Sequence, residues 1–446
     1  MTKILIRGAR VLAAPPERVD AATTDILIDG SAIAAIGPQL DAGEATEVVD
    51  GAGRLVLPGL INCHLHTWQT PLRGLAADWS LMEYLMRVHG RVAEHFTPQD
   101  IYDGTLAGAL NQIAGGTTTV GDWCHNNPTP EHTDAAVAAL QASGIRALFM
   151  HGTPGAGPGI APSPHPRDEL ERLLNGAFGD REGRLTLGIA IPGPMYSPLE
   201  IAEHDLRLAK DLGLIASMHH SGGPTPAVDP WPLLEAKGLL GPHVNIVHGN
   251  HLDDETLARL VGAGVTFTVT PEVEMGDGHG HPITGRLRAL GAAPSLGIDI
   301  EAAISGEMLT AARMALAHQR ALDHAAARNG AGPSAGPPRG AEALGWVTRE
   351  GARALGLAGR VGALEVGMQA DLVMVDAEAF NLQPANDPVA TVLQAHPGNI
   401  DAVMIAGCWR KQNGGLCRDD LAELSLSVRR IAARVLGAAG LAAPAA

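Results

Sequence analysis

The pattern of hydrophobic and polar residues at the two ends of the chain differs from the pattern in its middle. Residues 1–57 alternate short β-branched runs (KILIRGARVL, DILIDGSAIAAIG, EVVDGAGRLVLPG) with Gly, Asp and Pro, which is typical of small antiparallel strands. Residues 363–415 show the same pattern in ALEVG, ADLVMVD and DAVMIAGCWRK. Because neither short end can bury a core alone, we expect residues 1–57 and 363–420 to pair into one composite β-domain.

Between these ends, short apolar runs alternate with segments of helical periodicity. HTDAAVAALQASG, LEIAEHDLRLAKDLG and DDETLARLVGAG place apolar residues at i, i+3 and i+4 and end at Gly. Eight strand–helix units predict an α/β fold, namely a (β/α)8 TIM barrel over residues 58–362. A doubly wound sheet is disfavoured because the first turn lacks a dinucleotide-binding glycine signature. Residues 421–446 are predicted as a C-terminal helix and tail. The eight predicted strands are Leu60–Cys63, Thr117–Cys124, Arg146–Gly152, Leu185–Ile191, Leu214–His219, Val244–His248, Val265–Thr270 and Pro294–Ile300.

The amino-acid composition limits the kinds of binding partner that can be expected. The 446 residues are 46% hydrophobic and 18% charged, with a formal net charge of −16, so the chain is too apolar for disorder and too acidic to favour phosphate backbones or anionic membranes. We therefore expect a small-molecule substrate, with no nucleic acid and no membrane as partners. The four cysteines are widely spaced and form no C-x-x-C pair, which indicates reduced thiols and a cytoplasmic location.

Four of the predicted strands end in polar residues that could bind a metal ion. LINCHLH carries His64 and His66 two residues apart, which puts both imidazoles on one face of a strand; ASMHH, NIVHGNH and PSLGIDI carry His219, His248 and Asp299. Active sites of such barrels lie at the carboxyl ends of the strands. A single His at a strand end is more often a hydrogen-bonded core residue, but this joint occurrence favours a divalent metal site such as zinc.

The same segments resemble a known family. LPGLINCHLHTWQTPLRGL, GGTTTVGDW, ASMHH, NIVHGNHLDDE, APSLGIDI and GRVGALEVGMQADLVMVD are similar, in this order, to the amidohydrolase superfamily, in its cytosine deaminase and triazine hydrolase branch. The resemblance implies that the two chain ends form a small β-sandwich beside the barrel. It also implies His64, His66, His219 and Asp299 as metal ligands, Asp299 as proton acceptor and His248 as a catalytic residue that contacts the substrate.

The resemblance also bears on metal number and assembly. Binuclear members of the superfamily bridge two ions with a modified lysine at the end of strand four, whereas this strand, RLTLGIAIPGPMYS, has none. We therefore expect one divalent metal per chain, Zn²⁺ or alternatively Fe²⁺. A homo-oligomer, either a dimer or a tetramer, is also expected.

One position departs from the branch. Its deaminases carry a glutamate three residues after the strand-five histidine, where this chain has Gly222, or Gly223 counted from His220. Glycine cannot transfer a proton, so His220, Glu272 or Glu274 would have to substitute. The candidates for lining the substrate pocket are Trp68, Gln69, Arg73, His125, Met195, His220 and Glu272.

The sequence thus predicts a metal-dependent hydrolase that uses an activated water on a carbon–nitrogen bond of a small, nitrogenous, heterocyclic molecule. Ring deamination and amide or carbamate hydrolysis stay open within this prediction. The alternatives are a hydrolytic dehalogenase of a halogenated heteroaromatic compound and a non-catalytic barrel that keeps its metal ligands for binding.

Overall fold

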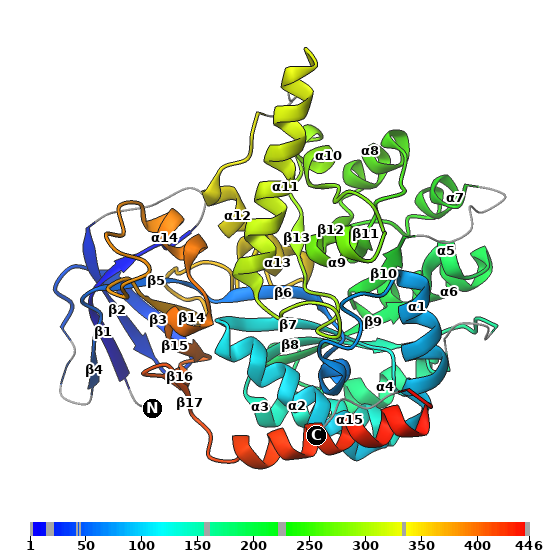
Figure 1. The fold of residues 1–446 in the computed structure, drawn as a ribbon, viewed down its shortest axis with the longest axis horizontal. Coiled ribbons are helices and arrows are strands. Elements are labelled where there is room, and N and C mark those ends of the chain that lie inside the picture. The colour runs from blue at the N-terminus through cyan, green and yellow to red at the C-terminus, as the bar shows by residue number, and fades with distance from the viewer. Residues whose placement is uncertain are drawn as a thin grey trace.

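The computed structural model describes residues 3–14, 22–41, 43, 46–155, 161–221, 229–331 and 336–441. Within these residues one sheet has eight strands in the order β13-β12-β11-β10-β9-β8-β7-β6, all paired in parallel (Figure 1). A parallel bridge between Leu65 and Asp299 brings the last strand back beside the first. The predicted (β/α)8 barrel is confirmed. Its strands are β6 (Leu60–Leu65), β7 (Thr117–Cys124), β8 (Arg146–Gly152), β9 (Leu185–Ile191), β10 (Ala216–His220), β11 (Val244–His248), β12 (Thr266–Val269) and β13 (Ser295–Leu296).

The eighth strand is shorter than predicted. The apolar run Pro294–Ile300 predicts seven extended residues, but only Ser295–Leu296 pair as a strand. Asp299 has a φ of 70°, in the left-handed region, which interrupts the extended backbone of the run. The run therefore ends in a turn that carries the Asp299 side chain at the barrel rim.

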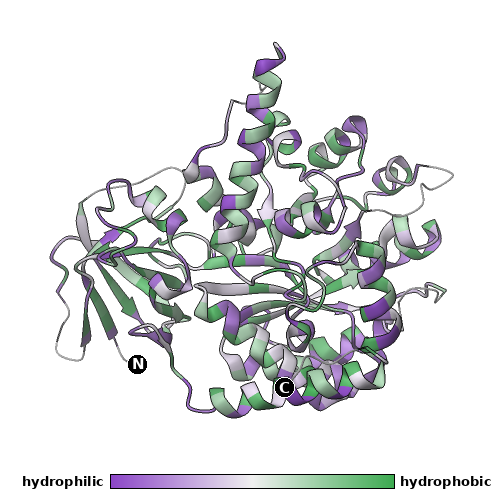
Figure 2. Cartoon of the chain, viewed as in Figure 1, coloured by the Kyte–Doolittle hydropathy of each residue, from purple (hydrophilic) through white to green (hydrophobic). Residues whose placement is uncertain are grey.

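Helices cover the barrel strands on both sides in Figure 1, and Figure 2 shows hydrophobic residues concentrated on the strands. The predicted helices occur at Pro130–Ser143, Leu199–Leu212 and Asp254–Gly262 (α3, α6 and α8). Gly144 and Gly213 terminate the first two with φ angles of 78° and 64°, a conformation that lacks a steric penalty only for glycine. The other α-helices are α1 (Leu81–Tyr84), α2 (Pro98–Ala114), α4 (Arg167–Asn175), α5 (Gly193–Tyr196), α7 (Trp231–Ala236), α9 (Pro271–Gly276), α10 (Thr284–Ala289), α11 (Met308–Arg328), α12 (Gly340–Trp346), α13 (Arg349–Ala354), α14 (Pro388–Gln394) and α15 (Leu421–Ala438).

A second, mixed sheet joins both chain ends. Its order is β17-β16-β15-β14-β5-β1-β2-β3, with β4 paired to β1, and the two ends meet where β5 runs antiparallel to β14. Ile6, Ile28, Val56 and Met374 pack in a core cluster of this sheet. The strands are β1 (Lys3–Val11), β2 (Thr23–Asp29), β3 (Ala32–Gly37), β4 (Thr46–Asp50), β5 (Arg54–Pro58), β14 (Leu372–Asp376), β15 (Ile400–Ile405), β16 (Cys408–Gln412) and β17 (Gly415–Leu416).

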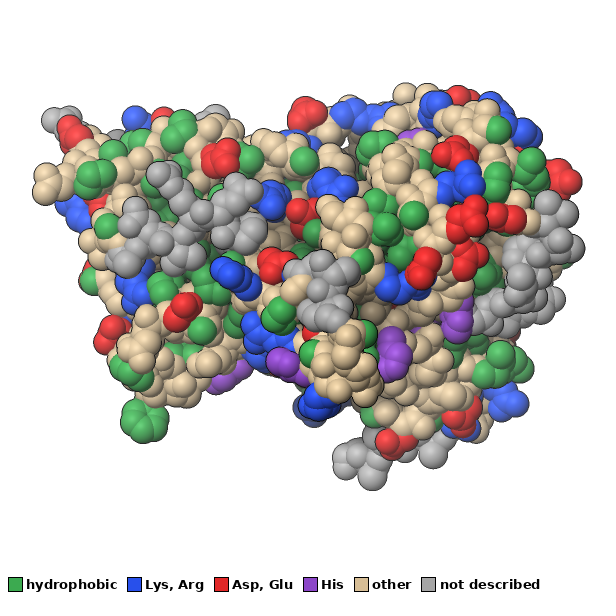
Figure 3. All heavy atoms as spheres, turned by 90° about the horizontal axis from the view of Figure 1, so that it is seen from above, with side chains coloured by type: hydrophobic (Ala, Val, Ile, Leu, Met, Phe, Trp, Pro, Cys, Tyr) green, Lys and Arg blue, Asp and Glu red, His purple; other side chains and the backbone are tan. Residues whose placement is uncertain are grey.

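Polar contacts join the parts of the molecule. The Arg146 guanidinium on β8 donates to the Asp371 carboxylate of the small domain at 2.7 Å, and both side chains are buried. Helix α15 packs along α2, where Arg434 pairs with Asp100. On the face seen in Figure 3, acidic and basic side chains are interspersed. Among the described residues no helix is both long and apolar enough to cross a membrane.

Candidate active site

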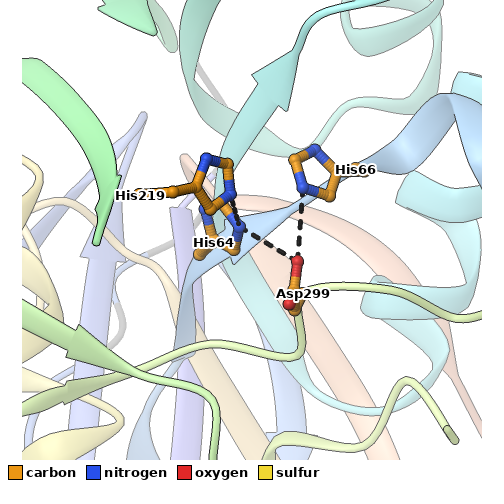
Figure 4. A group of neighbouring side chains, drawn as sticks. All are labelled: His64, His66, His219 and Asp299. Atoms are coloured by element: carbon orange, nitrogen blue, oxygen red, sulfur yellow. Dashed lines mark hydrogen bonds and ion pairs between the residues drawn. The ribbon is translucent and has the colours of Figure 1, made fainter. Parts of the chain in front are cut away.

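Four side chains converge at the barrel rim, and we refer to them as the metal cluster: His64, His66, His219 and Asp299 (Figure 4). One ligand atom from each lies within 4.8 Å of the others. His64 Nε2 is 3.1 Å from both Asp299 Oδ1 and His219 Nε2, and His66 Nε2 is 3.2 Å from Asp299 Oδ1. Three ring nitrogens and one carboxylate around a common point match the donor types of zinc sites.

Local backbone geometry explains how these side chains meet. His64 lies on β6, and His66 follows the strand two residues later, so alternation keeps both imidazoles on the same side. The backbone directly after β13 approaches His64 closely, because a Cβ at Gly297 would lie 2.9 Å from the His64 Cβ. Asp299 and His248 both have positive φ, at 70° and 72°. Non-glycine residues adopt this conformation at a cost, and such strain clusters at functional sites.

Burial sets the protonation of the cluster. Burial lowers the pKa of His64 to about 4 and that of His219 well below its ordinary value, with the neighbouring histidines adding to the effect at His219. Burial opposes ionisation of Asp299, but hydrogen bonds with His64 and His66 hold the pKa of this carboxyl well below its ordinary value. At neutral pH His64 and His219 are thus neutral imidazoles and Asp299 is a carboxylate, which are the forms that bind metal.

Hydrogen bonds outside the cluster orient its ligands. The backbone carbonyl of Trp123 is 2.7 Å from His66 Nδ1, so this nitrogen carries the proton and Nε2 is left to face Asp299. Each of the four lysines in the sequence is engaged elsewhere: Lys3 with Asp29, Lys210 with Gly238, Lys237 with Glu203, and Lys411 with Ala114 and Pro397. A donor set for one ion fits the residues present.

His248 lies beside the cluster and is held from behind by Glu274. His248 Nε2 is 3.8 Å from Asp299 Oδ2, while its Nδ1 is 3.3 Å from Glu274 Oε1 and 3.1 Å from Thr270 Oγ1. The buried Glu274 also accepts the Thr270 backbone N–H at 2.7 Å and the Asn250 amide at 3.1 Å. Glu274 therefore positions the imidazole of His248.

One side of the cluster is an aromatic and polar wall. His125 lies 4.3 Å from His66 between ring centroids, and the fully buried Trp68 packs edge-on against His125. Gln69 donates to the Tyr84 hydroxyl at 2.6 Å, and His89 lies 3.0 Å from that hydroxyl and 3.1 Å from the His125 ring. Sequence reasoning missed Tyr84 and His89. Their signal is structural, since His89 lies in a π-helical segment, Leu85–Val92, a feature frequent at functional sites.

The other predicted pocket residues have the following surroundings. Arg73 is paired with Glu301 at 2.6 Å, and 45% of its side chain is exposed. His220 points to the other face of β10 from His219, with its ring centroid 6.0 Å from that of Trp231. Met195 is half-buried in α5, and Glu272 is half-buried with Glu307 and Arg313 as its charged neighbours. Gly222 and Gly223 lie outside the described residues.

The turn after α9 adds two residues that sequence reasoning did not select. Asp277 is 8% exposed, and its charge interacts with those of Asp299 and His248. His279 is 3% exposed, with its ring centroid 4.4 Å from that of His248. The DGHGH segment contains both residue types, but no periodicity in the sequence places them at the site.

Comparisons with known proteins show which proteins this chain resembles. The model of the Amidohydrolase family matches residues 55–410. A 5-methylthioadenosine/S-adenosylhomocysteine deaminase of Pelotomaculum thermopropionicum is 33% identical, covering 91% of this chain and 93% of its own length. An 8-oxoguanine deaminase of Pseudomonas aeruginosa is 28% identical, covering 94% of this chain and 96% of its own. The crystal structure of a zinc-bound adenosine deaminase from Xanthomonas campestris has a TM-score of 0.85 at 24% identity, covering 98% of this chain and 99% of that one.

Proposed function

Because the chain belongs to the amidohydrolase family, we propose that its metal cluster supports release of ammonia from an aminated nitrogen heterocycle of the purine or pyrimidine type. The family and the deaminases among its relatives make the chain a hydrolase of carbon–nitrogen bonds. The observation that carries the finer proposal is the juxtaposition of His248, oriented by Glu274, with Asp299 of the metal cluster. In this arrangement Asp299 can act as a base and His248 as an electrophilic group at the same reacting carbon.

The roles of the residues follow from their positions. A divalent metal held by the cluster would lower the pKa of water in the site. Asp299, whose carboxylate stays ionised, accepts a proton from the attacking water. His248 stabilises the negative charge that develops as the ring carbon becomes tetrahedral, and the wall formed by Trp68 and His125 packs against one side of the cluster.

The metal, the location and the assembly complete the proposal. The donor set of three imidazoles and one carboxylate supports zinc. Four cysteines without a disulfide support a cytoplasmic location. We also propose a homo-oligomer of two or four chains, which light scattering of the purified protein would test.

Ammonia release tests the proposed function. The zinc-loaded protein is assayed against aminopurines, aminopyrimidines and aminotriazines, with chlorinated and amide analogues of the same rings alongside. We expect ammonia from at least one aminated ring, and an activity reduced at least ~100-fold in His248→Ala with its metal retained. Chloride or carboxylate products without ammonia from any aminated ring would contradict deamination.

A further inference from the structure

The turn that follows α9 is fixed in place beside the metal cluster. The Asp277 amide donates to the Val273 carbonyl at 2.8 Å, which caps α9, and the Asp277 carbonyl accepts the Leu81 amide at 3.0 Å. The second bond ties the turn to the start of α1. The backbone of Asp277 is therefore held from two sides while its side chain stays unconstrained.

The Asp277 carboxylate has no bonding partner within the described part of the chain. Among the residues that the structure describes, it makes no hydrogen bond or ion pair, although the residue is only 8% exposed. Burial and the charge of Asp299, partly opposed by His248, together raise the pKa of Asp277 to about 7. A carboxyl group that titrates near neutrality can both give and accept a proton at working pH.

His279 packs this turn against His248. Its ring is tilted by 51° over His248, and neither of its ring nitrogens has a hydrogen-bond partner among the described residues. An unsatisfied buried polar group costs free energy, and in a functional site a ligand can supply the missing partner. His279 therefore packs against His248, and Asp277, on the other side of Gly278, interacts with the charge of His248.

Three other carboxyl groups near the site have hydrogen bonds or charged neighbours of their own. Glu274 accepts the Thr270 and Asn250 N–H groups, and Asp122 accepts from the backbone and hydroxyl of Thr67. Glu272 has Glu307 and Arg313 as its charged neighbours. The sequence offers no acid between His219 and Asp229. Asp277 differs from Asp122 and Glu274 in accepting no hydrogen bond among the described residues. It differs from Glu272 in that its charge interacts with those of Asp299 and His248.

We propose that Asp277 is the carboxyl group that transfers protons to and from the ring nitrogen side of the substrate, taking the place of a strand-five acid. This inference rests on the proposed deamination. The Asp277 carboxyl protonates the ring nitrogen as water adds to the amine-bearing carbon, and Asp299 takes one proton of that water. Asp299 then returns its proton to the amine. As the carbon–nitrogen bond breaks and ammonia leaves, the remaining hydroxyl proton passes to Asp277, which restores both groups and leaves a lactam product.

The test compares Asp277→Asn with wild type in the zinc-loaded protein. We expect kcat for ammonia release to fall at least ~100-fold, KM to change little, and metal content to stay the same, because only proton transfer is removed. Wild-type kcat/KM should decline as pH rises through the pKa of Asp277, and this limb should vanish in the variant. Asp277→Glu should recover part of the activity. Asp323→Asn, a buried control whose carboxylate accepts the Gln319 amide on α11, should match wild type.

A binding measurement separates this inference from the proposed function. Hypoxanthine, a lactam with a ring N–H that the Asp277 carboxylate can accept, is titrated calorimetrically into both proteins. Binding that weakens at least tenfold in Asp277→Asn supports the inference. If wild type releases ammonia and the kcat of Asp277→Asn stays within tenfold of the wild-type kcat, the inference alone is overturned. Wild type that neither releases ammonia from any aminated ring nor binds hypoxanthine overturns the proposed function and the inference together.

Discussion

Replacing Glu274 by Gln should impair catalysis while sparing metal binding. The side chain is fully buried and 3.3 Å from His248 Nδ1, and the glutamine oxygen can still accept the Thr270 N–H that Glu274 accepts at 2.7 Å. The substitution therefore keeps the local fold and removes one negative charge behind His248. None of the four cluster ligands is touched.

The magnitude follows from the separation. Coulomb's law at 3.3 Å with an effective dielectric constant of about 20 gives ~5 kcal/mol for a full charge pair, which is an upper bound. Hydrogen bonds to charged groups contribute about 1.5–3 kcal/mol. Because Glu274 orients His248 toward the negative charge that develops as the reaction proceeds, this loss falls on the transition state. We therefore expect kcat to drop ~10–100-fold with KM little changed.

The assay is steady-state ammonia release together with metal analysis of each protein. Glu255→Gln is the matched control, because Glu255 lies on α8 with 87% of its side chain exposed and pairs only with Arg259 at 3.7 Å. A Glu274→Gln enzyme with wild-type kcat and full metal content would refute the idea that Glu274 acts through His248.

Two further predictions concern the base and the response to pH. Asp299→Asn should lower kcat/KM on the order of 10³-fold, or about 4 kcal/mol, since ligand and base are one residue; steady-state kinetics within tenfold of wild type would place the base elsewhere. The metal-free protein should lose stability as pH falls from about 6.5 to 4. Burial lowers the folded-state pKa of His151 and His220 to about 4, so only the unfolded chain takes up protons in that range. Urea denaturation at several pH values should show the free energy of unfolding falling by at most ~1.4 kcal/mol per pH unit for each such histidine, and a flat profile would contradict this.

The barrel could be predicted because its strands are buried on both faces. A strand in a parallel sheet covered by helices consists of consecutive apolar residues, so the runs Thr117–Cys124, Arg146–Gly152 and Leu185–Ile191 coincide with β7, β8 and β9. The eighth strand differed because hydropathy does not report the left-handed backbone at Asp299. That conformation depends on contacts across the barrel, such as the Asp299 amide bonded to the His64 carbonyl.

The closeness of the metal-cluster residues to one another also followed from the barrel topology. Parallel strands bring their carboxyl ends to one rim, so residues far apart in sequence, such as His64 and His219, could be expected to meet. The turn bearing Asp277 and His279 could not be placed in this way, because its position depends on the packing of α9 and α1. The sequence also did not indicate the partner of Arg73, whose guanidinium pairs with Glu301.

Metal content tests the central claim most directly. Wild-type protein loaded with zinc and freed of excess ion should hold about one equivalent per chain, because four donors suit a single ion. His64→Ala should lose the metal and the ammonia-releasing activity together, whereas the control His204→Ala, whose imidazole pairs with Asp205 on α6, should keep both. One equivalent retained in His64→Ala would contradict the assignment of the cluster, and wild type with about two equivalents would contradict a single-metal site.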